Sequence, residues 1–145
     1  MEQLVEALKK AQATSFAFYL KAHNYHWNVE GSNFAEYHEF LGDLYAEVFG
    51  AVDAIAEHCR TLDAYVPGSF SRFQELSSIE DELSVPKGIV MLSRLSADNQ
   101  RVIADLTLAY TAAEAAGKIG IANFLQDRID IHEKHGWMLR SFTKE

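Results

Sequence analysis

The sequence predicts an all-α fold in which four long helices form a bundle. Apolar residues recur every three or four positions over four long stretches, which is the spacing of amphipathic helices. No stretch of useful length alternates apolar and polar residues as a strand does, and no internal repeat of about 20–50 residues is present. The 145 residues are 48% apolar and 23% charged, an ordinary globular composition. We therefore expect a single domain over residues 1–145.

The first helix is predicted over residues 2–29, which hold strong helix formers and no proline. Gly31 follows as a stop signal, and Asn33 with Glu36 has the pattern of a capping box that opens the second helix. Because only a few residues separate the two helices, they are expected to pack antiparallel as a helical hairpin.

The second helix is predicted to begin at Phe34 and to extend about eight turns to Leu62. Residues 63–85 break the helical pattern with Pro67-Gly68, several serines and the acidic run 80–82. This region predicts an extended crossover that contains a short helix around residues 70–77.

The third helix is predicted to begin near Pro86, with Ser84 as its cap, and to end near Gly117. The fourth is predicted from Ile119 to Phe142. Four long helices, with one long crossover between the second and the third, describe a ferritin-like bundle with a short extra helix in that crossover.

Charge and cysteine content exclude several classes of protein. The net charge of −8 argues against a nucleic-acid-binding surface, which needs basic side chains to displace counterions from phosphates. One cysteine, Cys59, excludes an internal disulfide framework and is predicted to be a buried small apolar residue. No apolar run is long enough to span a membrane, and no signal peptide precedes the first helix, so we expect a soluble, cytoplasmic protein.

Potential metal ligands lie on one stripe of the second helix. At about 100° per residue, His38, Asp53 and Glu57 fall within a sector about 100° wide, together with position 42. His38 and Asp53 are nevertheless about 22 Å apart along the helix axis. One copy of the helix cannot close a metal site with these residues.

Two copies of the helix can close such a site. In two antiparallel helices related by a two-fold axis, the numbers of facing residues have a constant sum. The numbers 38 and 57 have the same sum as 42 and 53. A two-fold axis near residues 47 and 48 would therefore place His38 opposite Glu57 and position 42 opposite Asp53. Imidazole and carboxylate together suit iron or zinc. In the alternative interpretation, Asp53 and Glu57 solvate an exposed face and the histidines lie in the core. The spacing alone does not decide between the two.

The other histidines and the tryptophans give weaker signals. No Glu-x-x-His motif is present, which argues against a di-iron centre inside one subunit. His132 and His135 are three apart rather than the four of a zinc-protease helix, so they predict a polar helix face. His23 is predicted to be a packing or interface residue and His58 a surface residue. Trp27 and Trp137 are predicted to lie in the core.

Three runs of the sequence resemble the Dps family of mini-ferritins. They are His26-Trp27-Asn28-Val29-Glu30-Gly31-Ser32-Asn33-Phe34, then His38-Glu39, then Asp53-Ala54-Ile55-Ala56-Glu57. The last helix is similar to the family too, and the likeness covers about residues 4–142. The resemblance implies a hollow twelve-subunit shell with a ferroxidase centre at each two-fold dimer interface.

The resemblance also implies which residues act. His26 and His38 would come from one subunit and Asp53 and Glu57 from its partner, and these four would be both the metal ligands and the catalytic residues. The protein would oxidise Fe(II), with hydrogen peroxide in preference to oxygen, and store ferric mineral, which limits oxidative damage. Zinc is the other metal expected at this site.

The sequence departs from the family in three places. Gly42 stands where the family usually has a carboxylate, so one iron position would be weaker or would use Asp43 through water. Lysine-rich tails, common in family members that bind DNA, are missing, and twelve copies would carry roughly −96, so we expect weak or no direct DNA binding. Residues 117–123 also lack the aspartates that often line the family's three-fold pores.

Two other functions stay open at this point. One is a DNA-compacting structural protein in which the ferroxidase centre is secondary. The other is a helical assembly protein whose site is vestigial or holds zinc, an alternative that Gly42 keeps open.

Overall fold

The computed structural model describes residues 1–144, which fold into helices without any strand. The helices are α1 (Glu2–Asn28), α2 (Phe34–Arg60), α3 (Phe70–Leu76), α4 (Gly88–Ala115) and α5 (Ile119–Thr143). The predicted all-α fold, with its short helix in the crossover, is confirmed.

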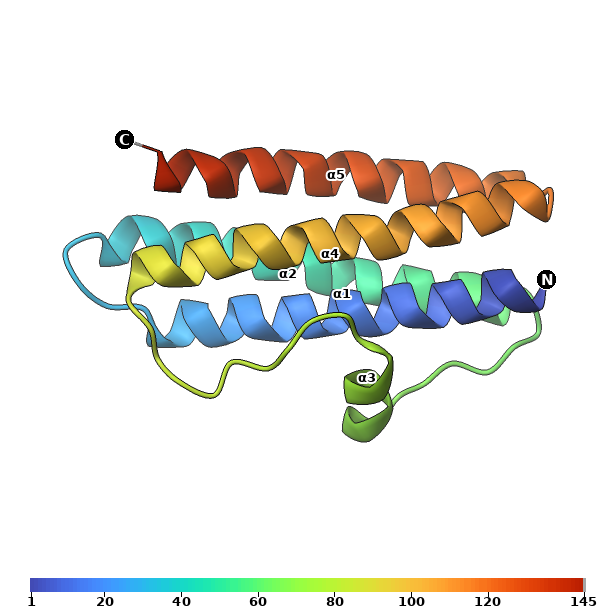
Figure 1. Cartoon of the computed structure of the whole chain (residues 1–145), viewed down its shortest axis with the longest axis horizontal. Helices are drawn as coiled ribbons and strands as arrows, with labels where there is room; N and C mark the ends of the chain where they lie inside the picture. The colour runs from blue at the N-terminus through green and yellow to red at the C-terminus, as the bar shows by residue number, and fades with distance from the viewer. Residues whose placement is uncertain (145) are drawn as a thin grey trace.

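The four long helices pack side by side around one core (Figure 1). α1 packs against α2 and α4, and α5 packs against α4. α2 and α5 lie farther apart and meet mainly through long side chains, from Tyr37 against Phe142 at one end to His58 against Phe124 at the other. Burial of large apolar side chains stabilises this arrangement, by about 1.5–3 kcal/mol for each fully buried side chain. The largest of them are at most 2% exposed and include Leu8, Phe18, Tyr25, Leu41, Leu44, Ile55, Leu92, Leu95, Leu106 and Leu125. Cys59 is buried among them as expected, and burial raises the pKa of its thiol.

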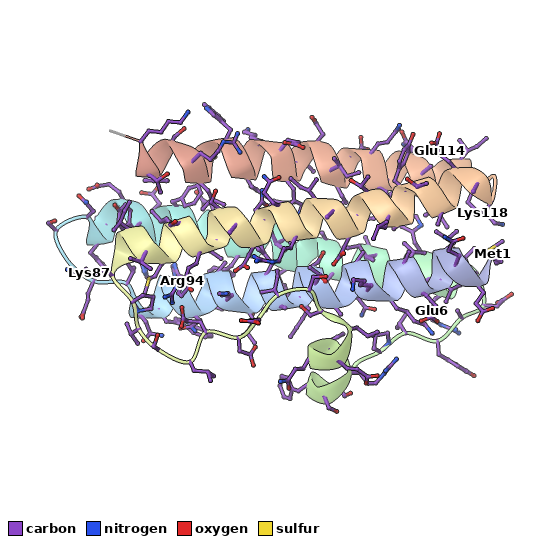
Figure 2. The ribbon with its side chains drawn as sticks, in the orientation of Figure 1. Met1, Glu6, Lys87, Arg94, Glu114 and Lys118 are labelled. Atoms are coloured by element: carbon purple, nitrogen blue, oxygen red, sulfur yellow. The ribbon has the colours of Figure 1, made fainter. Side chains whose placement is uncertain are left out.

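The crossover runs along the outside of α1 from one end of the bundle to the other, and α3 lies on α1 (Figure 1). Two clusters of polar side chains bind the crossover to α1 and α4. The buried carboxylate of Asp105 on α4 accepts hydrogen bonds from Thr14 Oγ1 at 2.7 Å and Ser78 Oγ at 2.6 Å. Nearer the start of α4, where Figure 2 labels Arg94, Glu82 accepts hydrogen bonds from Arg94 and from Tyr25.

The predicted caps were right for the position of Asn33 but wrong for its hydrogen bonding and for Ser84. Asn33 occupies the N-cap position of α2, but its side chain makes no capping hydrogen bond. Its amide lies 3.4 Å from the Tyr37 hydroxyl instead. Lys87, rather than Ser84, is the N-cap of α4, and the Ser84 hydroxyl bonds to Glu82. Asn33 thus lies at the start of α2 without capping it through its side chain, and Ser84 belongs to the crossover.

None of the helices within residues 1–144 has a segment that is long and apolar enough to cross a membrane.

Candidate metal centre

The α1–α2 hairpin brings His26 and His38 together. His26 lies in the last turn of α1 and His38 in the second turn of α2. The link between them includes Gly31 at φ +115°, a conformation that residues with a Cβ rarely adopt. The two imidazole rings stack with their centroids 3.7 Å apart and their planes 17° apart. The structure thus brings together the two histidines that the resemblance assigns to one subunit.

Each of these histidines is held by the backbone of the other. His26 Nδ1 lies 2.7 Å from the carbonyl oxygen of His38, and His38 Nδ1 lies 2.8 Å from that of His26. A carbonyl oxygen can only accept, so both Nδ1 atoms carry the proton. Both Nε2 atoms therefore present a lone pair, which is the form in which imidazole binds a metal ion.

Gly42 lies directly against the His26 ring. A Cβ at position 42 would come within 3.2 Å of His26 Cε1 and 3.3 Å of its Nδ1, which is closer than usual. The missing side chain lets His26 lie close to α2, but it also leaves position 42 without a donor. The neighbouring Asp43 lines the groove between α2 and α5, beside His135 and Met138.

Asp53 and Glu57 lie on the exposed face of α2, about 22 Å and about 28 Å from His38 along the helix. Neither forms an ion pair or a side-chain hydrogen bond within residues 1–144. In that part of the chain no three His, Cys, Asp or Glu side chains are grouped to hold a metal ion. A single chain thus carries a pair of nitrogen donors at one end of α2 and a pair of carboxylates at the other.

An exposed aromatic cluster borders the histidine pair. His23 is stacked between Tyr45 at 3.7 Å and Trp27 at 3.8 Å, so its predicted packing role is confirmed. Trp27 is 61% exposed, and Phe49, which packs on Tyr19, is 54% exposed. The prediction that Trp27 lies in the core was wrong, as it was for Trp137, which is 58% exposed. This face of α1 and α2 is therefore apolar as well as open.

A second polar cluster lies inside the bundle, and sequence reasoning missed it. His132 is fully buried, which corrects its prediction as part of a polar face, and it contacts Arg128 and Asn99. Arg128 and His135 both bond to Glu47 of α2. The signal was the spacing of residues 128, 132 and 135, which places all three on one stripe of α5.

Comparison with known proteins gives the family. Residues 5–145 match the ferritin-like domain family. The DNA protection during starvation protein of Brevibacillus brevis is 32% identical over 146 residues, covering 99% of this chain and 97% of the relative.

Solved structures give the same result. Dps from Thermosynechococcus elongatus superposes with a TM-score of 0.95 at 26% identity, over 99% of this chain and 92% of the other. A Dps protein from Vibrio cholerae, described as a member of a broad superfamily of ferritin-like diiron-carboxylate proteins, superposes with a TM-score of 0.94 at 26% identity, over 99% and 90%.

Proposed function

This chain belongs to the Dps mini-ferritins of the ferritin-like family, and from that premise we propose that it oxidises Fe(II) at centres shared by two copies of itself. His26 and His38 of one copy and Asp53 and Glu57 of the other would form each centre. The ferric product would be stored as mineral inside the assembled shell. This activity withholds Fe(II) from the reactions that generate hydroxyl radicals.

The stacked histidine pair is the observation that carries this proposal. Its two Nδ1 protons are fixed by backbone carbonyls, so both Nε2 lone pairs are available without rearrangement. The carboxylates of Asp53 and Glu57 have no partner within residues 1–144 and lie at the opposite end of the same exposed face. Antiparallel packing of two copies supplies each pair with the other.

The middle of α2 is suited to such packing. The two-fold axis that pairs residue 38 with residue 57 also pairs Ala46 with Phe49 and Tyr45 with Gly50. Each pair matches a small residue with an aromatic one, so the helices can approach closely and bury the Phe49 ring. The isologous contact would create two identical centres in each dimer.

The donors determine the chemistry of the centre. Two neutral imidazoles and two carboxylates offset the charge of Fe(II) and suit a transition metal. Iron is the substrate: each Fe(II) gives up one electron, and one hydrogen peroxide accepts two electrons and two protons to become water. Oxygen is the slower oxidant in this proposal. Zinc competes for the same four donors.

Gly42 leaves the centre with fewer carboxylates than the family pattern. One iron position is therefore held more weakly, and Asp43 contributes only through water from the α5 side of α2. The centre would function with two histidines, Asp53 and Glu57 as its direct ligands.

The assembly would be a cytoplasmic dodecamer built from these dimers. Direct DNA binding would be weak, because each chain carries a net charge of −8. This charge favours attraction of Fe(II) rather than of phosphate.

The test is the initial rate of Fe(II) oxidation, measured with peroxide and with oxygen. Asp53→Ala should oxidise Fe(II) at least about tenfold more slowly. A direct metal ligand contributes more than the hydrogen-bond partners that orient the ligands, whose loss costs about 10–100-fold in metal affinity or activity. Glu36→Ala removes another exposed carboxylate of α2 and should oxidise iron at the wild-type rate. Unchanged oxidation by Asp53→Ala would refute the site assignment.

A further inference from the structure

The polar cluster on α5 is separate from the histidine pair between α1 and α2. It is buried at Arg128 and His132, whereas the Glu47 side chain is 34% exposed and lines the groove between α2 and α5. Arg128 is 5% exposed and His132 is fully buried, with the edge of the ring of Phe18 against it. Glu47 reaches this cluster from α2, and Asn99 reaches it from α4. The proposed function uses none of these side chains.

Arg128 occupies the centre of the cluster. Its Nη2 lies 3.0 Å from Glu47 Oε1 and 3.0 Å from His132 Nε2, and its Nη1 bonds to Glu47 Oε2. His135 Nε2 lies 2.7 Å from the same Glu47 Oε1. The Nε of Arg128 is buried without a hydrogen-bond partner in the described part of the chain. Nη2 of Arg128 thus lies between Glu47 Oε1 and His132 Nε2, while Nε of the same guanidinium lacks a hydrogen-bond partner in the described part of the chain.

The imidazole of His132 is held as a lone-pair donor toward Arg128. Its Nδ1 lies 2.8 Å from Asn99 Oδ1, and Asn99 Nδ2 donates to the His132 carbonyl at 2.8 Å, which fixes the ring. An arginine cannot accept, so Nε2 of His132 accepts from Arg128 and Nδ1 donates to Asn99. Burial, and then the charges of Arg128 and His135, lower the pKa of His132 to about 3.

Glu47 supplies the negative charge. Burial alone would raise the pKa of Glu47, but hydrogen bonds from His135 and Arg128 and their charges outweigh it and lower the pKa to about 2. An ionised carboxylate and two imidazoles from two facing helices are the kind of donor set from which helical bundles build metal sites.

We propose that the guanidinium of Arg128 is a built-in cation that fills a latent divalent-metal site formed by Glu47, His132 and His135 inside the bundle. With Arg128 in place, these three side chains are not grouped to hold a metal ion. The guanidinium takes the space between the donors and neutralises Glu47, so a divalent ion has neither room nor net charge to attract it. Arg128 is therefore a specificity-determining residue that keeps metal ions out of the bundle interior. This inference does not depend on the proposed ferroxidase centre.

The test is Co²⁺ binding by equilibrium dialysis together with the visible absorption of the bound ion. Arg128→Ala should bind one more Co²⁺ per chain than the wild type does. The double variant Arg128→Ala/His132→Gln should bind this additional ion at least about tenfold more weakly, because a direct ligand is gone. Arg101→Ala is the matched control: it removes a cation from Asp98, which pairs with Lys21 and Arg101 and bonds to no histidine in residues 1–144, so it should gain no ion.

Arg128→Ala leaves Glu47 without its cation and can therefore unfold. In that case the proposal predicts that Co²⁺ restores the helical circular-dichroism signal of Arg128→Ala but not that of the double variant. The proposal is overturned if Arg128→Ala neither gains an ion nor refolds with Co²⁺. It is equally overturned if the double variant gains the ion as the single variant does.

Discussion

At the scale of single residues, the polar side chains of this protein are oriented by backbone carbonyls and amides. His26 and His38 each bond to the carbonyl of the other, and Asn99 bonds to both the ring and the carbonyl of His132. An imidazole fixed in this way keeps one tautomer, so its other ring nitrogen keeps a lone pair that can accept a hydrogen bond or bind a metal ion. The free nitrogens of His26 and His38 lie at the surface, and that of His132 accepts from Arg128 in the interior.

The buried His132 should make the protein sensitive to acid. Its pKa falls from the ordinary 6.5 to about 3, so between these values the unfolded chain binds a proton that the folded chain does not. The pKa of Glu47 falls from 4.5 to about 2, which has the same sign at lower pH. Stability should therefore be complete above pH 6.5 and should fall as the pH drops, by up to about 1.4 kcal/mol per pH unit for one proton.

Urea unfolding between pH 7.5 and 4.5 measures this dependence. His132→Gln should have a lower free energy of unfolding at neutral pH. That free energy should also fall less steeply between pH 6.5 and 4.5 than it does in the wild type. His58→Gln, whose ring packs on Phe124 away from this network, should keep the wild-type slope. An undiminished slope in His132→Gln would show that another group is responsible.

The resemblance to the Dps family assigned His26 and His38 to one subunit, and the short link between their helices explains why the two rings meet. The burial of His132 could not be predicted from His132 and His135 alone. It depends on which stripe of α5 faces α2 and α4, and the apolar pattern of α5 defines that stripe less sharply than that of α2. Trp27 was misplaced because a large apolar ring favours burial in any context, including contact with a second subunit.

At the scale of elements, the long crossover is held to the bundle by hydrogen bonds as well as by apolar contacts such as those of Ile79 and Phe73. Asp105 on α4 accepts from both Thr14 on α1 and Ser78 in the crossover, and the Ser78 amide donates to Thr14 Oγ1 at 3.0 Å. One threonine thus joins three segments of the chain. The four long helices were predictable from apolar periodicity, but these anchors were not, because they join residues far apart in the sequence.

Thr14→Val tests the role of this anchor. The substitution keeps the shape of the side chain and removes two hydrogen bonds, the one donated to the buried Asp105 and the one accepted from the Ser78 amide. Each loss should cost about 1–3 kcal/mol. Hydrogen exchange in residues 77–82 should accelerate, while exchange in α5 changes little. Thr107→Val, at an exposed position of α4, is the control and should leave both unchanged. Equal protection of the crossover in Thr14→Val and the wild type would contradict this account.

At the scale of the whole molecule, the exposed face of α1 and α2 determines whether a complete centre can exist. Phe49 and Trp27 are too exposed to stabilise a single chain, and their burial requires a partner. The spacing of residues 38, 42, 53 and 57 along α2 predicts the position of a two-fold axis, and a single chain does not test that prediction.

Phe49→Lys should weaken the assembly by introducing a charge where Ala46 of the partner copy is expected to lie. Sedimentation should then show smaller species than the wild type forms, and iron oxidation should fall with them. Thr111→Lys introduces the same charge at an exposed position of α4, on the other side of the bundle, and should change neither. If Phe49→Lys assembles as the wild type does, the contact lies elsewhere.

Mixed assemblies test the shared centre most directly. One chain would carry His26→Ala and His38→Ala, and the other Asp53→Ala and Glu57→Ala, so that neither variant alone has a complete centre. Unfolded together and reassembled, they should regain roughly a quarter of the wild-type rate of Fe(II) oxidation, since half of randomly formed dimers are mixed and each mixed dimer has one intact centre of two. Mixtures that stay as inactive as the separate variants would contradict the claim that two chains build one centre.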